Sequence, residues 1–294
     1  MQEIKNVLIL GAGTLGSRIG LQAAISNYSV TVYDIHESAL EQSQIVMHKV
    51  LKYAAKMGMV KVEDKPAILS RIKFTTNPQE AVKDADIISE SVTENPSIKE
   101  IVWKQFGEMA PAKTIFTTNT SYLLPSQFAT LSGRPEKFCA FHFHDVFTAR
   151  VVDIMPHPGT HAELIPLLYD FGKKLNQVPV IVKKETPGYL FNFMLMALIG
   201  AAGRLKTKEI GSIEDIDKSW MVNFNMPMGP FGILDNIGLD TAWHVTKDRD
   251  DPPSQTFAAL LKTYVDQGKL GEKTGEGFYK YPNPVYKDID FLSK

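Results

Sequence analysis

The sequence predicts an α/β fold: a Rossmann-like, doubly wound and mostly parallel sheet followed by a smaller all-α domain. Three observations carry this prediction. Apolar, β-prone segments alternate with helical periodicity from the N-terminus to Lys184. A glycine-rich turn, Gly11-Ala12-Gly13-Thr14-Leu15-Gly16, directly follows the first of these strands. After the helix-breaking cluster at 185–188 the strand pattern stops, and only helical segments follow.

Two kinds of element alternate in the first predicted domain, residues 1–184. The short apolar segments predicted as strands are 6–10, 28–33, 86–92, 114–118, 138–143, 150–155 and 178–183. The segments with helical spacing of apolar residues are 14–26, 38–59, 65–72, 97–109, 125–131 and 162–175. Strands that alternate with helices indicate parallel pairing, with helices on both faces of the sheet.

The second predicted domain, residues 185–294, is helical. Its expected helices are 189–205, 212–221, 231–245 and 256–267. The first of them is apolar nearly all round, so it must be buried within the domain or at a contact between subunits. We therefore expect a homodimer.

The glycine turn predicts a dinucleotide site. Gly11 allows a tight turn, Gly13 lets the backbone approach a pyrophosphate, and Gly16 lets helix and strand pack closely. The helix that begins inside the turn offers free N–H groups and the positive end of its dipole. Asp34, at the end of the second strand, would accept hydrogen bonds from ribose hydroxyls and repel a 2′-phosphate, which favours NAD. The predicted cofactor-binding residues of this unit are Gly11, Gly13, Thr14, Leu15, Gly16 and Asp34.

Composition excludes several other classes. With 32 basic and 33 acidic residues the net charge is −1, so neither nucleic acid nor a membrane surface is an expected partner. Cys139 is the only cysteine, which rules out an internal disulfide and fits a reducing, cytoplasmic location. The first strand begins too early to leave room for a signal peptide. The longest apolar run, 189–202, is too short to cross a bilayer.

Polar side chains gather after the later strands, where parallel sheets bind their ligands. Ser121 follows the strand at 114–118, His142 lies near the end of the strand at 138–143, and Asp153 lies in the next strand. Histidine moves protons near neutral pH, and a carboxylate on its second nitrogen would orient the ring. Ser121 and Asn192 could hold a hydroxyl or carbonyl oxygen. With NAD, this set predicts reversible oxidation of an alcohol.

Longer stretches resemble the 3-hydroxyacyl-CoA dehydrogenase family, nearly end to end. The family's Asn-Thr-Ser element corresponds to Asn119-Thr120-Ser121, its histidine to His142, and its second-domain asparagine to Asn192 after Pro187-Gly188-Tyr189. The other matching stretches are Glu94-Asn95 with Lys99, 227–231, 234–240 and 271–279. The resemblance implies that His142 is the general acid/base and that Ser121 and Asn192 bind the reacting oxygen. It also implies that Glu94, Lys99 and Asn119 belong to the NAD site.

The chain departs from the family beside the histidine. The family has His-Phe-Phe-Asn-Pro, whereas here His144 and Asp145 follow His142-Phe143. In the family a catalytic Glu follows the histidine along the chain. Here the corresponding acid is Asp153, and it lies one position closer to His142. Three possibilities follow. The backbone bulges to compensate, the pairing of His142 with Asp153 is weakened, or Asp145 or His144 takes part in the site. His144 shares a strand face with His142, but no third ligand is evident, and we expect no metal.

These departures leave the substrate open. We expect a small molecule, a 3-hydroxyacyl compound as its CoA thioester. The alternatives are a non-CoA substrate, because the altered element also resembles diketoreductase, gulonate 3-dehydrogenase and carnitine dehydrogenase relatives, or a non-catalytic NAD-binding protein.

Overall fold

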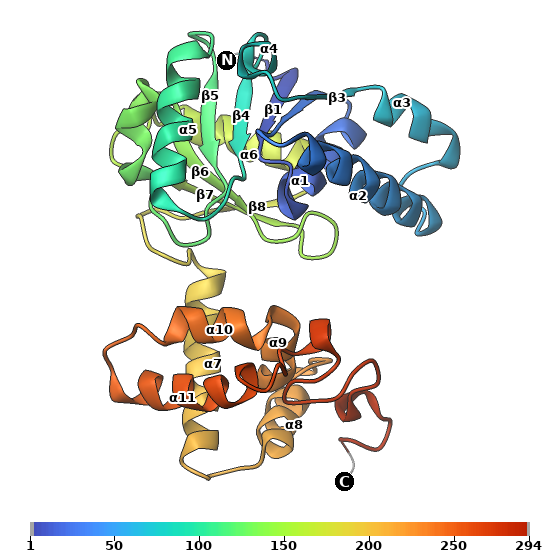
Figure 1. The fold of residues 1–294 in the computed structure, drawn as a ribbon, viewed down its shortest axis with the longest axis vertical. Helices are drawn as coiled ribbons and strands as arrows, with labels where there is room; N and C mark the ends of the chain where they lie inside the picture. Colours follow the sequence, from blue (N-terminus) through green and yellow to red (C-terminus); the bar gives the residue numbers. More distant parts are fainter. Residues whose placement is uncertain (1–2, 293–294) are drawn as a thin grey trace. The chain divides into compact units, whose positions relative to one another are not determined.

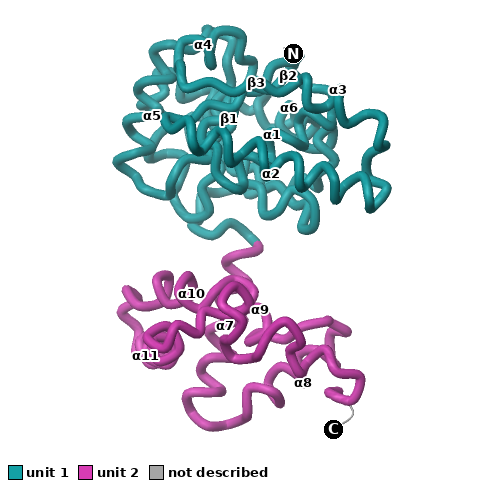
Figure 2. The backbone as a smooth tube through the Cα atoms, turned by 45° about the vertical axis from the view of Figure 1, so that its right-hand side comes forward, with its two compact units in different colours: residues 1–190 teal, residues 191–294 magenta. Residues whose placement is uncertain are grey.

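The computed structural model describes residues 3–292, which form two compact units. The first ends at Leu190 and the second begins at Phe191 (Figure 2), whereas the sequence placed the boundary after Lys184. Each unit has its own hydrophobic core. No helix in the described part of the chain has both the length and the apolar character needed to cross a bilayer.

An eight-stranded sheet forms the centre of the first unit. Its strands lie in the order β3-β2-β1-β4-β5-β6-β7-β8, and every neighbouring pair is parallel except β6 and β7. The order reverses between β1 and β4, which is where such sheets bind nucleotides. The strands are β1 Asn6–Leu10, β2 Ser29–Tyr33, β3 Ile72–Thr75, β4 Ile87–Glu90, β5 Ile115–Thr118, β6 Phe138–Phe143, β7 Val151–Pro156 and β8 Val178–Ile181.

Helices cover both faces of the sheet (Figure 1), as the doubly wound prediction requires. Side chains alternate along β1, so Val7 and Ile9 pack into one core while Leu8 and Leu10 pack into the other. The first core is completed by α1 Thr14–Ile25, α2 Glu37–Lys56, α3 Lys65–Leu69 and α6 Leu164–Lys174. The second is completed by α4 Pro78–Val82, α5 Pro96–Met109 and short 3₁₀ turns. The predicted fold class is confirmed.

Two predicted helices of the first unit differ from the structure. The predicted helix 65–72 ends at Leu69, and Ile72–Thr75 forms the edge strand β3 followed by α4, neither of which was predicted. In β3, Ile72 is buried and Phe74 packs partly buried against the core, but an apolar alternation over only four residues is too short to be told from the end of the preceding helix. The segment 125–131 forms two 3₁₀ turns, Pro125–Gln127 and Ala129–Ser132, in place of an α-helix.

The second unit is all helical in its regular structure. Its helices are α7 Phe191–Thr207, α8 Ile213–Phe224, α9 Pro230–Ile237, α10 Leu239–Thr246 and α11 Pro252–Val265. The predicted single helix 231–245 is two helices, because Gly238 has φ +102° and breaks the backbone path between α9 and α10.

A buried carboxylate, Asp217, fixes the start of α9. It accepts hydrogen bonds from the backbone N–H groups of Phe231 and Gly232 at 2.9 and 3.0 Å and from the hydroxyl of Tyr279 at 2.9 Å. Burial nevertheless raises the pKa of Asp217 to about 6. The fold of the second unit therefore depends partly on the buried carboxyl group of Asp217, whose ionised form is disfavoured by burial.

Candidate active site

A cavity of about 630 Å³ opens at the glycine turn, inside the first unit. A Cβ on Gly11 would lie 2.6 Å from the Ser91 carbonyl oxygen, and one on Gly16 would lie 2.1 Å from the Gly11 carbonyl oxygen. At Gly13, in contrast, a Cβ would meet nothing within 4 Å. Two glycines are thus required by close packing, and the third leaves the backbone open toward the cavity.

The carboxylate of Asp34 lies at the rim of this cavity, at the end of β2. Its two oxygens accept hydrogen bonds from the backbone N–H groups of Ala12 at 2.9 Å and His36 at 3.0 Å. Thr14 begins α1 and is exposed, while Leu15 packs partly buried against the core. An open turn at a helix start beside a fixed acid suits a dinucleotide with ribose hydroxyls.

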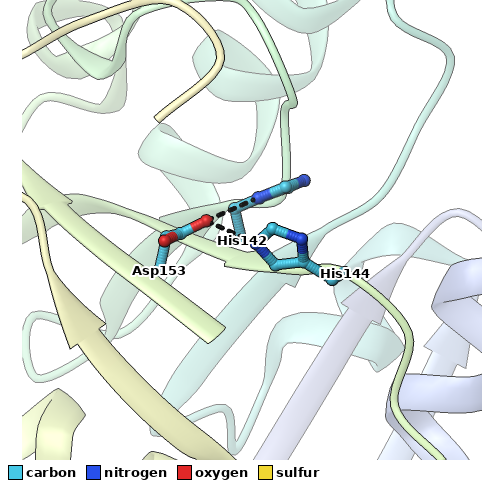
Figure 3. A group of neighbouring side chains, drawn as sticks. All are labelled: His142, His144 and Asp153. Atoms are coloured by element: carbon cyan, nitrogen blue, oxygen red, sulfur yellow. Dashed lines mark hydrogen bonds and ion pairs between the residues drawn. The ribbon is translucent and has the colours of Figure 1, made fainter. Parts of the chain in front are cut away.

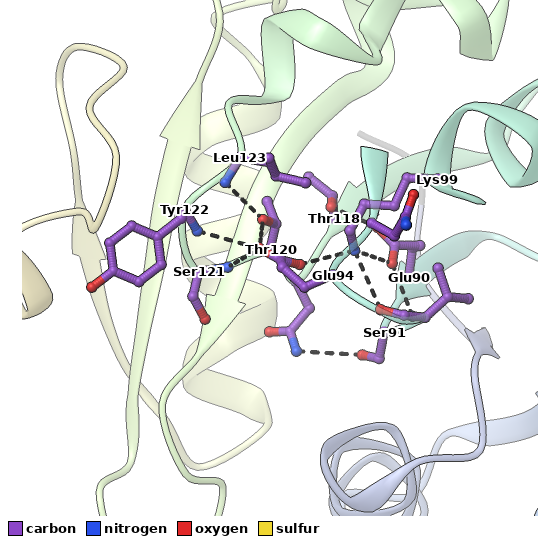
Figure 4. Close-up of polar contacts among 12 residues, drawn as sticks. Glu90, Ser91, Glu94, Lys99, Thr118, Thr120, Ser121, Tyr122 and Leu123 are labelled. Atoms are coloured by element: carbon purple, nitrogen blue, oxygen red, sulfur yellow. Dashed lines mark hydrogen bonds and ion pairs between the residues drawn. The ribbon is translucent and has the colours of Figure 1, made fainter. Parts of the chain in front are cut away.

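Glu90, the last residue of β4, forms a buried ion pair with Lys99 of α5. Their side chains are 0 and 1% exposed. Their charged atoms are 2.6 Å apart, and the Lys99 ammonium also lies 3.3 Å from Glu94 (Figure 4). Burial raises the pKa of Glu90, and the lysine together with the Thr118 hydroxyl opposes that shift. The ammonium of Lys99 is thus directed at two acids of its own chain.

Glu94 holds the loop that carries Ser121 (Figure 4). One of its carboxylate oxygens accepts hydrogen bonds from the Thr120 hydroxyl, from the Ser121 backbone N–H at 3.1 Å and from the Tyr122 backbone N–H at 3.4 Å. Because Lys99 contacts the other oxygen, the ion pair and the loop form one connected network. The family resemblance placed Glu94 and Lys99 at the cofactor, and the structure adds this bracing role.

Asn119 links the cavity to the strand that carries His142. Its side-chain oxygen accepts a hydrogen bond from the Phe143 N–H at 2.7 Å, and its amide group donates to the Ser91 hydroxyl at 3.4 Å. Ser91 lines the cavity, and Phe143 is the last residue of β6. Asn119 therefore fixes the distance between the cofactor cavity and the histidine.

Three predicted site residues form a continuous line of hydrogen bonds. The Ser121 hydroxyl lies 3.1 Å from His142 Nε2, and His142 Nδ1 lies 3.2 Å from Asp153 Oδ2. His142 and Asp153 are direct partners in the antiparallel β6–β7 register, which runs without a break from Cys139↔Pro156 to Phe143↔Val152. The shortened spacing along the chain thus places the acid opposite the histidine with no bulge in either strand.

Of the two other groups considered as partners of His142, one reaches Asp153 and the other does not. His144 Nε2 lies 2.7 Å from the same Oδ2 atom of Asp153 (Figure 3). Asp145 pairs instead with Arg18 at 2.5 Å and accepts hydrogen bonds from backbone N–H groups of the following turn.

Burial and hydrogen bonding set the charges of this group. Burial lowers the pKa of His142, and the hydrogen bond to Asp153 only partly opposes it. The pKa of Asp153 is lowered, because the bonds from His142 and His144 outweigh the raising effect of its burial. At neutral pH the arrangement is a neutral His142 beside an ionised Asp153.

Tyr189 completes the surroundings of His142. Its ring stacks on the imidazole with centroids 4.7 Å apart and planes 14° apart. Its hydroxyl donates to the Thr120 carbonyl at 2.7 Å. The sequence did not identify Tyr189 and Glu90 as members of the site. The available signals were an acid at the end of the apolar segment 87–90 and a tyrosine where the family has a Phe-like position.

Two predictions stay predictions: that Asn192 binds the substrate oxygen, and that the protein holds no metal. Asn192 lies in the first turn of α7, in the second unit, and its contact with the substrate oxygen is untested. The sequence showed no third ligand beside His142 and His144, and this was wrong, because the structure brings Asp153 to them: their ligand atoms all lie within 4.8 Å of one another, a set that could hold a divalent ion. Each histidine, however, already has the carboxylate as its hydrogen-bond partner.

Comparison with known sequences assigns the family. Residues 6–186 match the profile of the 3-hydroxyacyl-CoA dehydrogenase NAD-binding domain, and residues 188–281 match that of the C-terminal domain. The chain belongs to the 3-hydroxyacyl-CoA dehydrogenase family. It is therefore an oxidoreductase with an NAD-binding domain, and the resemblance seen in the sequence is confirmed.

Individual relatives cover almost the whole chain. A probable 3-hydroxyacyl-CoA dehydrogenase of Caenorhabditis elegans is 34% identical over 96% of this chain and 94% of its own length. The mitochondrial hydroxyacyl-coenzyme A dehydrogenase of Homo sapiens is 33% identical over 95% of this chain and 91% of its own. Among solved structures, a diketoreductase described as acting on dicarbonyl compounds superposes with a TM-score of 0.90 at 38% identity, covering 96 and 100% of the two chains.

Proposed function

We propose that this protein interconverts a 3-hydroxyacyl-CoA thioester and the corresponding 3-ketoacyl-CoA, with NAD as the hydride carrier and His142 as general acid/base. The observation that carries the proposal is the continuous line of hydrogen bonds Ser121–His142–Asp153, with distances of 3.1 Å from Ser121 Oγ to His142 Nε2 and 3.2 Å from His142 Nδ1 to Asp153 Oδ2. Ser121 lies in the loop after β5, His142 and Asp153 lie on β6 and β7, and Asn119 ties this line to the glycine-turn cavity. NAD supplies the hydride acceptor when bound.

In the oxidation, the side chains of this chain handle the proton. Burial keeps His142 neutral, so Nε2 is able to accept the proton of the substrate hydroxyl. Ser121, which faces the same nitrogen, aligns the oxygen. As His142 becomes an imidazolium, the ionised Asp153 stabilises it through Nδ1. We assign Asn192 to the same oxygen and Glu94, Lys99 and Asn119 to the NAD site.

A non-CoA 3-keto or diketo substrate is the second candidate. It is favoured by the diketoreductase similarity and by the departure from the family's pattern at His144 and Asp153. A third possibility, a non-catalytic NAD-binding protein, is disfavoured by the intact hydrogen-bond line from Ser121 to Asp153.

The three possibilities are separated by NADH consumption with acetoacetyl-CoA and, in parallel, with an uncoupled 3,5-diketo ester. Faster turnover of the thioester supports the CoA proposal, and turnover of the ester alone replaces it with the second candidate. If NADH binds but neither compound is reduced, the catalytic proposal fails. His142→Ala should abolish the activity, whereas His161→Ala, at an exposed histidine outside the site, should leave it intact.

We also propose a homodimer in the cytoplasm. The dimer is supported by exposed apolar side chains of the second unit, at Phe193, Met194, Val222 and Phe224. A cytoplasmic location is supported by the single cysteine, Cys139, which is buried as a free thiol. Light scattering of the wild type and of Phe224→Glu tests the first proposal, and cell fractionation tests the second.

A further inference from the structure

The carboxylate of Asp153 serves two imidazoles through one atom. Oδ2 lies 3.2 Å from His142 Nδ1 but 2.7 Å from His144 Nε2, so the shorter bond goes to the residue outside the predicted catalytic line (Figure 3). Asp153 is only 1% exposed, which leaves its orientation to be set by these neighbours. A buried carboxylate is stabilised by each donor that it gains.

The strand geometry explains how both rings reach the same oxygen. Residues 142 and 144 lie on one face of the chain at β6, two positions apart. Asp153 is the direct partner of His142, while the His144 N–H bonds to the Val151 carbonyl at 3.2 Å. His144 is therefore the diagonal neighbour of Asp153 across the strand pair, at a distance that a long side chain can span. A phenylalanine at 144 could fill the space but could donate no hydrogen bond.

We infer that His144 is a positioning residue that holds Asp153 in the orientation in which the shorter acid can serve His142. Aspartate has one methylene fewer than glutamate, so its carboxylate has little freedom to find His142 by its own rotation. The bond from His144 fixes that rotation and keeps the carboxylate ionised. The inference rests on the proposed function, because it concerns how the proposed base is oriented.

His144 also affects the electrostatics of the site. The titratable groups around His142 are Asp153 and His144 on the sheet, the stacked Tyr189, and Glu94 on the neighbouring loop. Among these, His144 lowers the pKa of His142 and Asp153 raises it. Removing the His144 ring should therefore move the His142-dependent limb of the pH–rate profile to higher pH.

The test compares His144→Phe with His144→Gln. Phenylalanine removes the donor, and we expect kcat to fall about tenfold, the effect of one lost charge-assisted bond, with NADH affinity unchanged. Glutamine keeps a neutral N–H donor and should restore kcat to within about threefold of the wild type. His161→Gln is the matched control, since His161 is exposed and outside the site.

A double-mutant cycle makes the test independent of general damage. In an Asp153→Asn background, His144→Phe should cause little further loss, because its effect passes through the carboxylate. The inference is overturned if His144→Phe keeps kcat within about twofold, if glutamine is as harmful as phenylalanine, or if the two losses simply multiply. Failure of the proposed function looks different: the wild type would then reduce neither the thioester nor the diketo ester.

Discussion

Replacing Asp153 with asparagine probes the proposed chemistry most directly. The side chain is nearly the same size, and its position opposite His142 in the strand register should be kept. What changes is the charge beside His142 Nδ1. The amide can also present N–H₂ to that nitrogen, which would force the imidazole into the tautomer whose Nε2 carries a proton.

The magnitude follows from these two losses. The charge-assisted bond at 3.2 Å becomes at best a neutral one, and part of the His142 population loses its function as a base at Nε2. General acid–base catalysis contributes about 10² to 10⁴ in rate, so we expect kcat to fall by about that factor. The loss in kcat/KM should be the same for alcohol oxidation and ketone reduction, because the equilibrium constant of the reaction does not depend on the enzyme.

The assay is steady-state turnover in both directions, with the NADH dissociation constant measured separately. NADH affinity should not change, because Asp153 does not line the cofactor cavity. Asp170→Asn, at an exposed aspartate of α6, is the control. If Asp153→Asn keeps kcat within about threefold in both directions, the acid has no part in the reaction.

Three further predictions concern the groups that support the site and the second unit. Lys99→Met should lower the free energy of unfolding by about 3–5 kcal/mol, because it leaves the buried Glu90 carboxylate without its partner. Urea titration measures this, and a loss below about 1 kcal/mol would contradict the prediction. Tyr189→Phe keeps the ring on His142 but removes the 2.7 Å bond to the Thr120 carbonyl, so kcat should fall about threefold to tenfold in turnover assays; an unchanged kcat would argue against a positioning role. The pKa of Asp217 is raised to about 6, so its contribution to stability is present in acid and lost as pH rises through that value. In thermal unfolding, the free energy of unfolding of the wild type, relative to that of Asp217→Asn, should rise by up to about 3 kcal/mol from about pH 8 to about pH 4. A relative rise toward high pH would contradict the predicted direction.

The sequence predicted those parts of the fold whose signals are local. A short apolar strand, a glycine turn and an acid at the next strand end suffice to place β1, α1 and β2. The edge strand β3 was missed because its apolar alternation spans only four residues and directly follows a helical pattern. The break at Gly238 was missed because the apolar periodicity continues through it, while the backbone does not.

The site was predictable in its residues but not in its connections. Ser121, His142 and Asp153 were identified from residue type and position. The pairing partner of His142 stayed open, because a spacing along the chain does not reveal the register of two antiparallel strands. The roles of Glu90 and Tyr189 depend on packing between segments far apart in the chain, to which a single sequence gives no direct access.

The stacking of Tyr189 on His142 bears on how the first unit can be isolated. The ring belongs to the last turn of chain in that unit, just before Phe191. A fragment cut after Lys184 would retain the glycine turn and the residues that line its cavity, yet one face of its histidine would be bare and the carbonyl of Thr120 would lose the Tyr189 donor. A fragment cut after Leu190 would keep both. Nucleotide affinity is thus a poor guide to where this enzyme can be divided, and the chemical environment of the His142 ring, followed by NMR, is a better one.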